Sequence, residues 1–320
     1  MSNPITYLTT SELDRDKTLL LVDASIQAYN AFYKDDMQKC AECNSGNIKP
    51  PSGYDFVDYW TGVDAFFHEF KRVECYGIVL RSQTPPYTYI FAFRGTDGIY
   101  DLIDDFGADD SAFVAHNKTV SIPADVAVES GFYHIYADSD DKTASMQSQV
   151  FALVDKYQAS DKPIAQLYST GHSLGCTLST LFVLDMALCR PEVKVSSYNY
   201  ASPRVGNPAF VSLYEQQTPQ QNPETRTLRI QNIYDKIPCT PMHTLEGYQH
   251  LPYGYLVSFY PDRLAGKLAI IDNHSVQNYR TVLEGALASE TGVFEATFKG
   301  YKDVTMKSVQ PDPKAVCSHW

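Results

Sequence analysis

Residues 164–188, with the sequence IAQLYSTGHSLGCTLSTLFVLDMAL, contain the clearest structural signal in the chain. This stretch begins with a short apolar run typical of a strand, and residues 177–188 are apolar on nearly every side, which predicts a deeply buried helix. Between them lies GHSLG (171–175), a G-x-S-x-G sequence at a strand-to-helix turn. The turn is crowded, so the positions two residues from the serine must lack a Cβ. The pentapeptide also occurs in ordinary tight turns, but this context predicts a nucleophile elbow that exposes Ser173 Oγ.

Strands and helices alternate on both sides of this stretch. The spacing of apolar residues predicts helices at 16–32, 55–70, 147–157, 177–188, 209–215 and 276–287, and strands at 76–80, 87–93, 164–168, 195–200 and 227–233. The first two strands flank Pro85-Pro86 and read as a hairpin. The alternation indicates an α/β fold with a mostly parallel central sheet and helices on both faces. No repeat and no linker divides residues 1–320, which predicts a single domain.

The composition limits the partners. Among 320 residues, 26 are Lys or Arg and 38 are Asp or Glu, so the net charge is −12. This acidic balance excludes nucleic acid as the main partner and disfavours electrostatic docking on anionic membranes. No apolar run reaches the ~18–20 residues of a transmembrane helix, so no such segment is predicted. The N-terminus lacks the features of a signal peptide, which favours a cytoplasmic protein, or a secreted one if the chain is a processed form.

Cysteine usage suggests reduced thiols. The seven cysteines are an odd number spread over the chain, which predicts mostly buried, unpaired side chains. Cys40 and Cys43 form a C-x-x-C sequence in a polar loop. A zinc site needs two more ligands at matching spacing, and the chain has no second C-x-x-C and no H-x-x-x-H. No metal is therefore expected, and a local disulfide and a chance spacing remain the two interpretations.

A serine nucleophile needs a base to take its proton and an acid to orient that base. In hydrolases with this elbow the acid follows the serine in the chain and the histidine comes last. Asp235 is the preferred acid because it follows the predicted strand at 227–233, at the carboxyl edge of the sheet. Asp185 is weaker because it lies within the elbow helix. Asp262 and Asp272 lie late in the chain, close to the candidate histidine.

Eight histidines compete for the role of base. Three precede Ser173 and violate the chain order, and His172 adjoins it and is expected to point away. His274 lies just ahead of the predicted helix at 276–287 and is preferred. His250, in a long loop soon after Asp235, is the alternative.

The oxyanion hole needs N–H donors from the elbow and from a loop after an earlier strand. The segment FRGT (93–96) ends such a strand. We therefore expect the N–H groups of Leu174 and Thr96 to be two donors, with the Thr96 hydroxyl as a third. The alternative is that the Gly-Thr pair only turns the chain.

An apolar stripe follows this loop directly. It consists of Ile99, Leu102, Ile103 and Phe106, at the i, i+3, i+4 and i+7 positions of one helical face, with acidic residues off the stripe. A lid would hold this face over the site and turn it toward lipid on opening. The alternative is a fixed helix packed on the core.

Four separated motifs together resemble the class 3 triacylglycerol lipase family of α/β-hydrolases. They are FAFRGT (91–96), GHSLG (171–175), ASPRVGNPAF (201–210) and YDKIP (234–238). The resemblance spans about residues 75–285 and implies an α/β-hydrolase fold. It also implies that Asp235 is the catalytic acid and that the family's final histidine is His274.

Three positions depart from the family pattern. Cys176 stands where a glycine usually follows the elbow, which affects helix packing. Glu129 stands where the family often has histidine and is not assigned a catalytic role. Leu102 replaces the usual tryptophan of the lid, which affects the behaviour of the lid more than the chemistry.

The sequence therefore predicts a serine hydrolase that cleaves carboxylic ester bonds of lipids through an acyl-enzyme. Ser173 attacks, His274 transfers the proton and Asp235 orients the imidazole. No metal or organic cofactor is implied, and the expected partners are a lipid or ester substrate and, transiently, a lipid surface. A soluble carboxylesterase or a phospholipase on the same fold is the alternative, and a non-catalytic lipid- or protein-binding module is a weaker one. The sequence leaves acyl length, head group, positional specificity and oligomeric state open.

Overall fold

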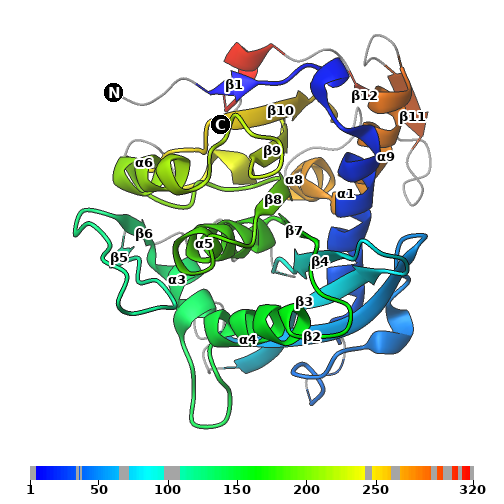
Figure 1. Ribbon diagram of the computed structural model, residues 1–320. Coiled ribbons are helices and arrows are strands. Elements are labelled where there is room, and N and C mark those ends of the chain that lie inside the picture. The colour runs from blue at the N-terminus through cyan, green and yellow to red at the C-terminus, as the bar shows by residue number, and fades with distance from the viewer. Residues whose placement is uncertain are drawn as a thin grey trace.

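An eight-stranded sheet runs through the molecule (Figure 1). The structure is a computed structural model that describes residues 5–33, 36, 38–64, 72–96, 109–241, 247–260, 267–289, 294–297, 305–308 and 312–317. Across the sheet the strands are β1 (Thr6–Tyr7), β10 (Tyr253–Val257), β9 (Thr227–Asn232), β8 (Val195–Tyr200), β7 (Gln166–His172), β4 (Thr88–Phe93), β3 (Arg72–Ser82) and β2 (Tyr54–Asp64). The strands from β4 to β1 are parallel, whereas β2 and β3 are antiparallel.

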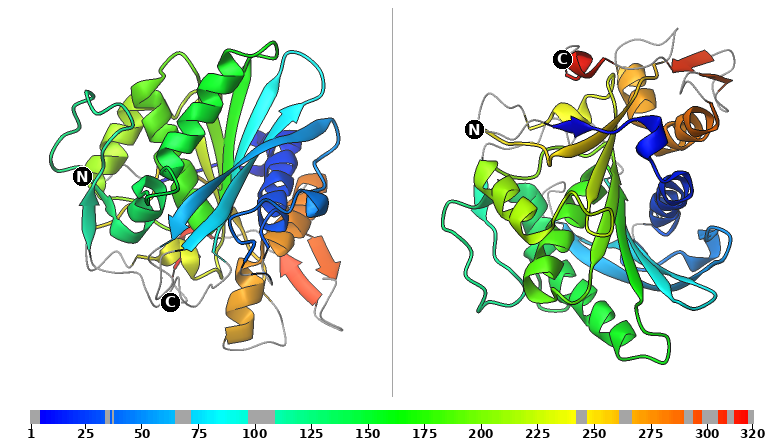
Figure 2. Two further views of the ribbon diagram at one scale, coloured as in Figure 1. Left: turned by 90° about the horizontal axis from the view of Figure 1, so that it is seen from below. Right: turned by 45° about the horizontal axis from the view of Figure 1, so that its top comes forward.

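Helices cover both faces of this sheet, as the two views of Figure 2 show. The helices α1 (Arg15–Asn30) and α9 (Val276–Ala288) pack on one face. The other face carries α3 (Ser130–Ala137), α4 (Met146–Gln158), α5 (Leu174–Cys189) and α6 (Pro208–Gln217). A short helix, α8 (Lys267–His274), precedes α9. The predicted single-domain α/β fold with a mostly parallel sheet is confirmed.

The smaller elements lie outside the main sheet. Two antiparallel ladders pair β5 (Asp110–Ala112) with β6 (Ala127–Glu129) and β11 (Phe294–Thr297) with β12 (Thr305–Ser308). Single 3-10 turns are η1 (Thr10–Glu12), η2 (Ser45–Asn47), η3 (Ile237–Cys239) and η4 (Pro313–Ala315).

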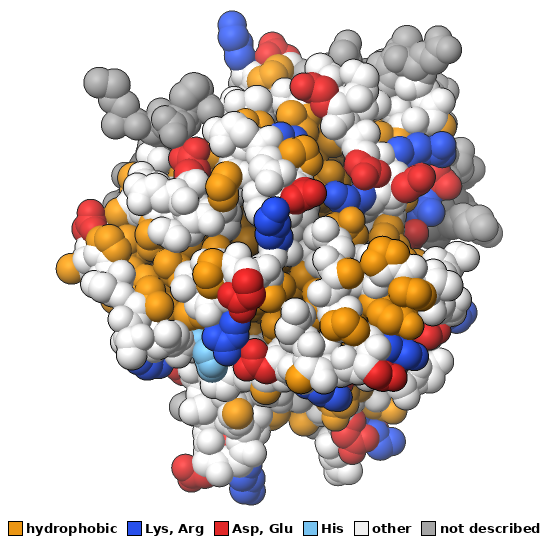
Figure 3. Space-filling model, viewed as in Figure 1, with side chains coloured by type: hydrophobic (Ala, Val, Ile, Leu, Met, Phe, Trp, Pro, Cys, Tyr) orange, Lys and Arg blue, Asp and Glu red, His pale blue; other side chains and the backbone are white. Residues whose placement is uncertain are grey.

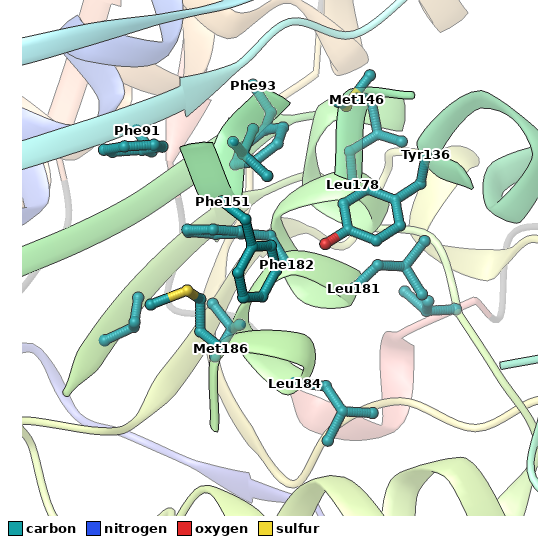
Figure 4. Close-up of a cluster of buried hydrophobic side chains, with 14 of the residues drawn as sticks. Phe91, Phe93, Tyr136, Met146, Phe151, Leu178, Leu181, Phe182, Leu184 and Met186 are labelled. Carbon is teal, nitrogen blue, oxygen red and sulfur yellow. The ribbon is translucent and has the colours of Figure 1, made fainter. Parts of the chain in front are cut away.

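Successive side chains of β4 pack alternately into two hydrophobic cores. Its odd-numbered aromatic residues pack into the core under α5, and Ile90 and Ala92 pack into the core under α1. The Phe91 ring stacks on Phe182 of α5 with centroids 5.5 Å apart, and Figure 4 shows this cluster. Residues 174–186 of α5 are buried on all sides, as predicted. This buried helix fixes the turn that precedes it.

The elements agree with the sequence prediction within a few residues, with one exception. The predicted helix at 55–70 is wrong, because residues 54–64 form β2. Its pairing with β3 shifts register at Phe56/Asp58 and again at Trp60/Thr61. Each irregularity breaks the two-residue alternation of the strand, so the apolar residues acquire a spacing that resembles a helix.

The expectation that the cysteines are mostly unpaired needs one correction. Cys239 and Cys317 form a disulfide across a sequence separation of 78 residues. Among the described residues the remaining cysteines are free: Cys40, Cys43, Cys75, Cys176 and Cys189. Spacing could not reveal the bridge, because the fold alone brings the C-terminal segment to the turn that contains Cys239.

Charged side chains of both signs lie interspersed with apolar ones on the face shown in Figure 3. No helix among the described residues has the length and apolar character needed to cross a bilayer.

Candidate active site

Ser173 lies on the turn between β7 and α5, in a strained backbone conformation. Its φ is 59° and its ψ is −130°, in a region that L-residues rarely occupy. A Cβ on Gly171 would lie 2.3 Å from the carbonyl carbon of Gly175, and a Cβ on Gly175 would lie 2.2 Å from the Phe93 carbonyl oxygen. Both glycines are therefore required by close backbone approaches. The turn has the geometry of a nucleophile elbow at the N-terminus of a buried helix.

The loop after β4 packs directly against this elbow. A Cβ on Gly95 would lie 2.6 Å from the His172 carbonyl oxygen and 3.1 Å from Ser173 Cβ. Thr96 therefore follows a residue that touches the elbow, and Leu174 begins α5 at the same edge of the sheet. The structure thus brings together the two segments expected to supply oxyanion donors.

The side chain of Arg94 anchors this loop to β3. Its side chain is buried and forms a salt bridge of 2.6 Å with Glu74, and its Nε donates to the Cys75 carbonyl at 2.8 Å. The guanidinium also stacks over the rings of Phe32 and Tyr76, at 3.9 and 4.6 Å. The sequence showed Arg94 only as part of a motif, and its anchoring role depends on partners far away in the chain.

Asp235 and His274 meet through a direct hydrogen bond. His274, the last residue of α8, places Nδ1 2.8 Å from Asp235 Oδ2. The Tyr279 hydroxyl donates to the same oxygen at 2.9 Å, and the Ile237 N–H donates to Oδ1 at 3.0 Å. The carboxyl group is buried, so these three hydrogen bonds fix its orientation. Tyr279 was missed by sequence reasoning because nothing in its local pattern distinguishes it from a core tyrosine.

The second ring nitrogen of His274, Nε2, differs from Nδ1 in its hydrogen bonding. A neutral imidazole that donates from Nδ1 has an acceptor at Nε2. Within the described residues, Nε2 is buried and has no hydrogen-bond partner, so the bond from Ser173 expected in a catalytic triad is not formed. Catalytic hydrogen bonds in ligand-free enzymes are often long and tighten when substrate binds.

His172 supports His274 through a hydrogen bond to its backbone carbonyl. His172 Nε2 lies 2.7 Å from the His274 carbonyl oxygen, and its Nδ1 lies 2.9 Å from the Tyr29 hydroxyl on α1. Burial and the nearby His274 ring hold the pKa of His172 well below its ordinary value. His172 is therefore neutral, donating to His274 and accepting from Tyr29. These hydrogen bonds join α1, the elbow and His274, and nothing in the local sequence pattern pointed to Tyr29.

The competing candidates lie elsewhere. His250 donates to the Pro238 carbonyl at 2.7 Å, and burial, with Arg229 nearby, holds its pKa well below the ordinary value. Asp185 accepts from the His116 N–H at 2.7 Å and from the Tyr136 hydroxyl at 3.0 Å, inside the core. Both are structural residues, and the structure brings His274, not His250, to Asp235.

Part of the predicted site lies in segments that the structure does not describe. The apolar stripe of Ile99, Leu102, Ile103 and Phe106 lies outside the described residues, as does Asp262. In the part of the chain that is described, no group of three or more His, Cys, Asp and Glu residues could hold a metal ion. Cys40 and Cys43 are both free, so the local disulfide that the spacing allowed is not formed here.

This geometry agrees with comparisons to known proteins. The profile of the lipase (class 3) family matches residues 90–245 of this chain. Phospholipase A1-II 1 of Oryza sativa subsp. indica is 28% identical over 164 residues, which cover 48% of this chain and 39% of that protein. The chloroplastic phospholipase A1-Ialpha2 of Arabidopsis thaliana is 26% identical over 188 residues, covering 51% of this chain and 36% of that one. The chain thus spans less than two-fifths of the length of these relatives.

Solved lipases share the fold at lower identity. Lipase II from Rhizopus niveus superposes with a TM-score of 0.55 at 20% identity, covering 80% of this chain and 82% of that chain. The nonglycosylated LIP2 lipase of Yarrowia lipolytica gives a TM-score of 0.57 at 18% identity, with coverages of 80% and 82%.

Proposed function

We propose that this protein is a serine hydrolase that cleaves carboxylic ester bonds of lipids through an acyl-enzyme. The observation that carries the proposal is the 2.8 Å contact between His274 Nδ1 and Asp235 Oδ2, beside a serine on a strained elbow. An imidazole oriented by a buried carboxylate, with a free acceptor nitrogen, is suited to take a proton from a nearby hydroxyl.

The residues divide the reaction between them. Ser173 Oγ attacks the ester carbonyl while His274 Nε2 takes its proton and Asp235 stabilises the imidazolium. The N–H groups of Leu174 and Thr96 hold the oxygen that becomes negative, aided by the N-terminus of α5. His274 then protonates the leaving alcohol, and a water molecule activated in the same way releases the acid. No step requires a metal or a redox cofactor.

Lipid is the proposed source of the ester. The supporting observations are the match of the lipase (class 3) family profile to residues 90–245 and similarity to proteins named lipases and phospholipases A1. The apolar stripe at Ile99, Leu102, Ile103 and Phe106 directly follows Thr96, where an apolar cover would meet acyl chains. A phospholipase is the second candidate, favoured by the names of the sequence relatives. A soluble carboxylesterase is the third.

A substrate panel tests the proposal. Purified protein is assayed on dissolved short-chain esters, emulsified triacylglycerols and phospholipid vesicles, together with Ser173→Ala and the exposed control Ser212→Ala. We expect Ser173→Ala to lower kcat by several orders of magnitude and Ser212→Ala to have no effect. Preference for long acyl chains supports a lipid substrate, and the head group separates lipase from phospholipase. Turnover that survives Ser173→Ala, or no ester turnover by the wild type, would contradict the proposal.

A further inference from the structure

Two stretches of the chain have the sequence of an acceptor for N-linked glycans. They are NKT (117–119) and NHS (273–275), and no other Asn-x-Ser or Asn-x-Thr occurs among the 320 residues. The tripeptide alone is a weak signal, because so short a pattern also occurs by chance. An acceptor must in addition lie on the surface, since the attached sugar is bulky and hydrophilic. The two stretches can therefore be distinguished by their structural surroundings.

The first stretch, residues 117–119, forms an exposed turn. Asn117 Oδ1 accepts hydrogen bonds from the Thr119 N–H at 3.1 Å and from the Thr119 hydroxyl at 2.8 Å, as in an Asx-turn. The Asn117 carbonyl oxygen accepts the Val120 N–H at 3.0 Å. These bonds engage the oxygen of the side-chain amide, and within the described part of the chain Nδ2 makes no hydrogen bond. The nitrogen that carries a glycan is therefore free on an exposed side chain.

This turn is attached to the end of α5 that lies opposite the candidate site. The Asn117 N–H donates to Cys189 Sγ at 3.3 Å, and the His116 N–H donates to Asp185 Oδ1 at 2.7 Å. Cys189 is the last of the 16 residues of α5, whereas Ser173 directly precedes the first. At a rise of about 1.5 Å per residue, the two ends of this helix lie ~24 Å apart. A sugar chain on Asn117 therefore begins far from Ser173.

The second stretch has the opposite surroundings. Asn273 is 5% exposed and lies in α8, directly before His274. Its carbonyl oxygen accepts from Asn232 Nδ2 at 3.1 Å, and its side-chain oxygen is buried. A sugar on Asn273 Nδ2 would displace the side chains that hold His274 beside Asp235. A chain that is modified at Asn273 therefore cannot adopt this fold.

The disulfide between Cys239 and Cys317 indicates the kind of compartment in which the chain folds. Such bonds form and persist in oxidising compartments, which include the lumen of the endoplasmic reticulum, and they are rare in the cytosol. N-linked glycans are attached in the same lumen, to asparagines of proteins on the secretory route. The disulfide and the exposed acceptor therefore independently indicate this route.

We propose that the folded protein carries an N-linked glycan on Asn117 and none on Asn273. The donor is an oligosaccharide joined through a diphosphate to a polyprenyl lipid, and an oligosaccharyltransferase catalyses the transfer. Asn117 Nδ2 attacks the anomeric carbon of the first sugar and loses one proton as the carbon–nitrogen bond forms. The bond between that carbon and the diphosphate oxygen breaks, and the lipid diphosphate leaves. The Thr119 hydroxyl completes the acceptor sequence.

Glycan mapping tests the proposal without an activity assay, so its result is independent of the proposed function. The full chain is directed into the secretory pathway of eukaryotic cells by a cleavable leader, and the protein is recovered from the medium. Peptide-N-glycosidase F in heavy-oxygen water then converts each glycosylated asparagine to a labelled aspartate, which peptide mass mapping locates. We expect a single glycan per chain, with the label on Asn117 and none on Asn273.

Three variants complete the test. Asn117→Gln removes the acceptor nitrogen and Thr119→Ala removes the hydroxyl, so each is expected to lose the glycan and to migrate on a gel like the deglycosylated wild type. Thr119→Ser is the matched control, because it keeps the hydroxyl and the acceptor sequence, and it is expected to retain the glycan. A wild type without a glycan, a label on Asn273, or a glycan that persists in Asn117→Gln would overturn the proposal.

Discussion

Tyr279 illustrates how a single hydroxyl holds the site together. It donates to Asp235 Oδ2 at 2.9 Å and accepts the Asn232 N–H at 2.7 Å. Tyr279 therefore joins the end of β9 to α9 and orients the carboxylate that orients His274. It is a positioning residue, because it acts through Asp235 and does not contact the reacting atoms.

Tyr279→Phe tests this role. Without the hydroxyl, Asp235 is held less firmly, and we expect kcat to fall about tenfold while KM stays close to the wild-type value. The Asn232 N–H also loses its partner, which costs about 1–3 kcal/mol of unfolding free energy. Steady-state kinetics and urea unfolding measure the two effects. A loss of stability with unchanged kcat would reduce Tyr279 to a purely structural residue.

The residues proposed for the site could be selected from the sequence, whereas the hydrogen bonds that hold them could not. Ser173, Asp235 and His274 could be chosen because the elbow has a local pattern and the acid and base follow a chain order. Tyr29, Tyr279 and the role of His172 could not, since each depends on contacts between residues far apart in the chain.

At the scale of elements, α3 begins at a buried carboxyl group. Glu129 is 1% exposed, and its Oε2 accepts the Phe132 N–H at 2.8 Å as the N-cap of the helix. Burial raises the pKa of Glu129 from 4.5 to about 7. Well below pH 4.5 the carboxyl group is neutral in both the folded and the unfolded state, so its ionisation does not change the free energy of unfolding. As the pH rises toward 7 the unfolded chain ionises first, so the folded protein loses stability until both forms are charged.

Glu129→Gln should remove this pH dependence. The amide keeps a cap acceptor but does not ionise, so between pH 5 and pH 8 the wild type should lose about 2–3 kcal/mol more stability than the variant. Urea unfolding at the two pH values measures the difference, with exposed Glu192→Gln as the control. Equal pH dependence in Glu129→Gln and the wild type would show that the buried carboxyl is already charged at low pH.

The segment at 97–106 lies outside the described residues, and its role as a lid stays a prediction. Each exposed apolar side chain that reaches lipid contributes ~1.5–3 kcal/mol, so two of them shift an open–closed balance by orders of magnitude. Leu102→Ser with Ile103→Ser should therefore lower turnover of emulsified long-chain ester far more than turnover of dissolved short-chain ester. Comparable losses on both substrates would identify the stripe as ordinary core and favour a soluble esterase.

The elements themselves were largely predictable from hydrophobic spacing. Strand β8 and helix α5 have regular patterns, and their predicted positions agree with the structure. Strand β2 was wrongly predicted as a helix because its register shifts distort the alternation of apolar residues. Its identity depends on pairing with β3, which a single-segment pattern does not contain.

Across the whole molecule, the two hydrophobic cores and the disulfide between Cys239 and Cys317 support the candidate site. The disulfide joins the C-terminal segment to Cys239, the last residue of η3, which follows Asp235. The Cys239 sulfur lies 3.8 Å from the Asp235 carbonyl oxygen. The bond therefore stabilises both the fold and the turn that presents the carboxylate.

Replacing both Cys239 and Cys317 by serine should reveal this dual effect. Loss of a bond that closes a long loop typically lowers unfolding free energy by about 2–5 kcal/mol. We expect a lower melting temperature and a steeper loss of ester turnover on heating than in the wild type. An unchanged melting temperature would show that this disulfide contributes nothing to stability.

The most direct test of the central claim is covalent labelling of Ser173. The wild-type protein is treated with a fluorophosphonate, and the adduct is located by peptide mass mapping, in parallel with Ser173→Ala and His274→Ala. We predict one adduct, on Ser173, with no labelling of Ser173→Ala and labelling of His274→Ala slowed by orders of magnitude. An adduct on another residue, or undiminished labelling of Ser173→Ala, would contradict the assignment of Ser173 as the nucleophile.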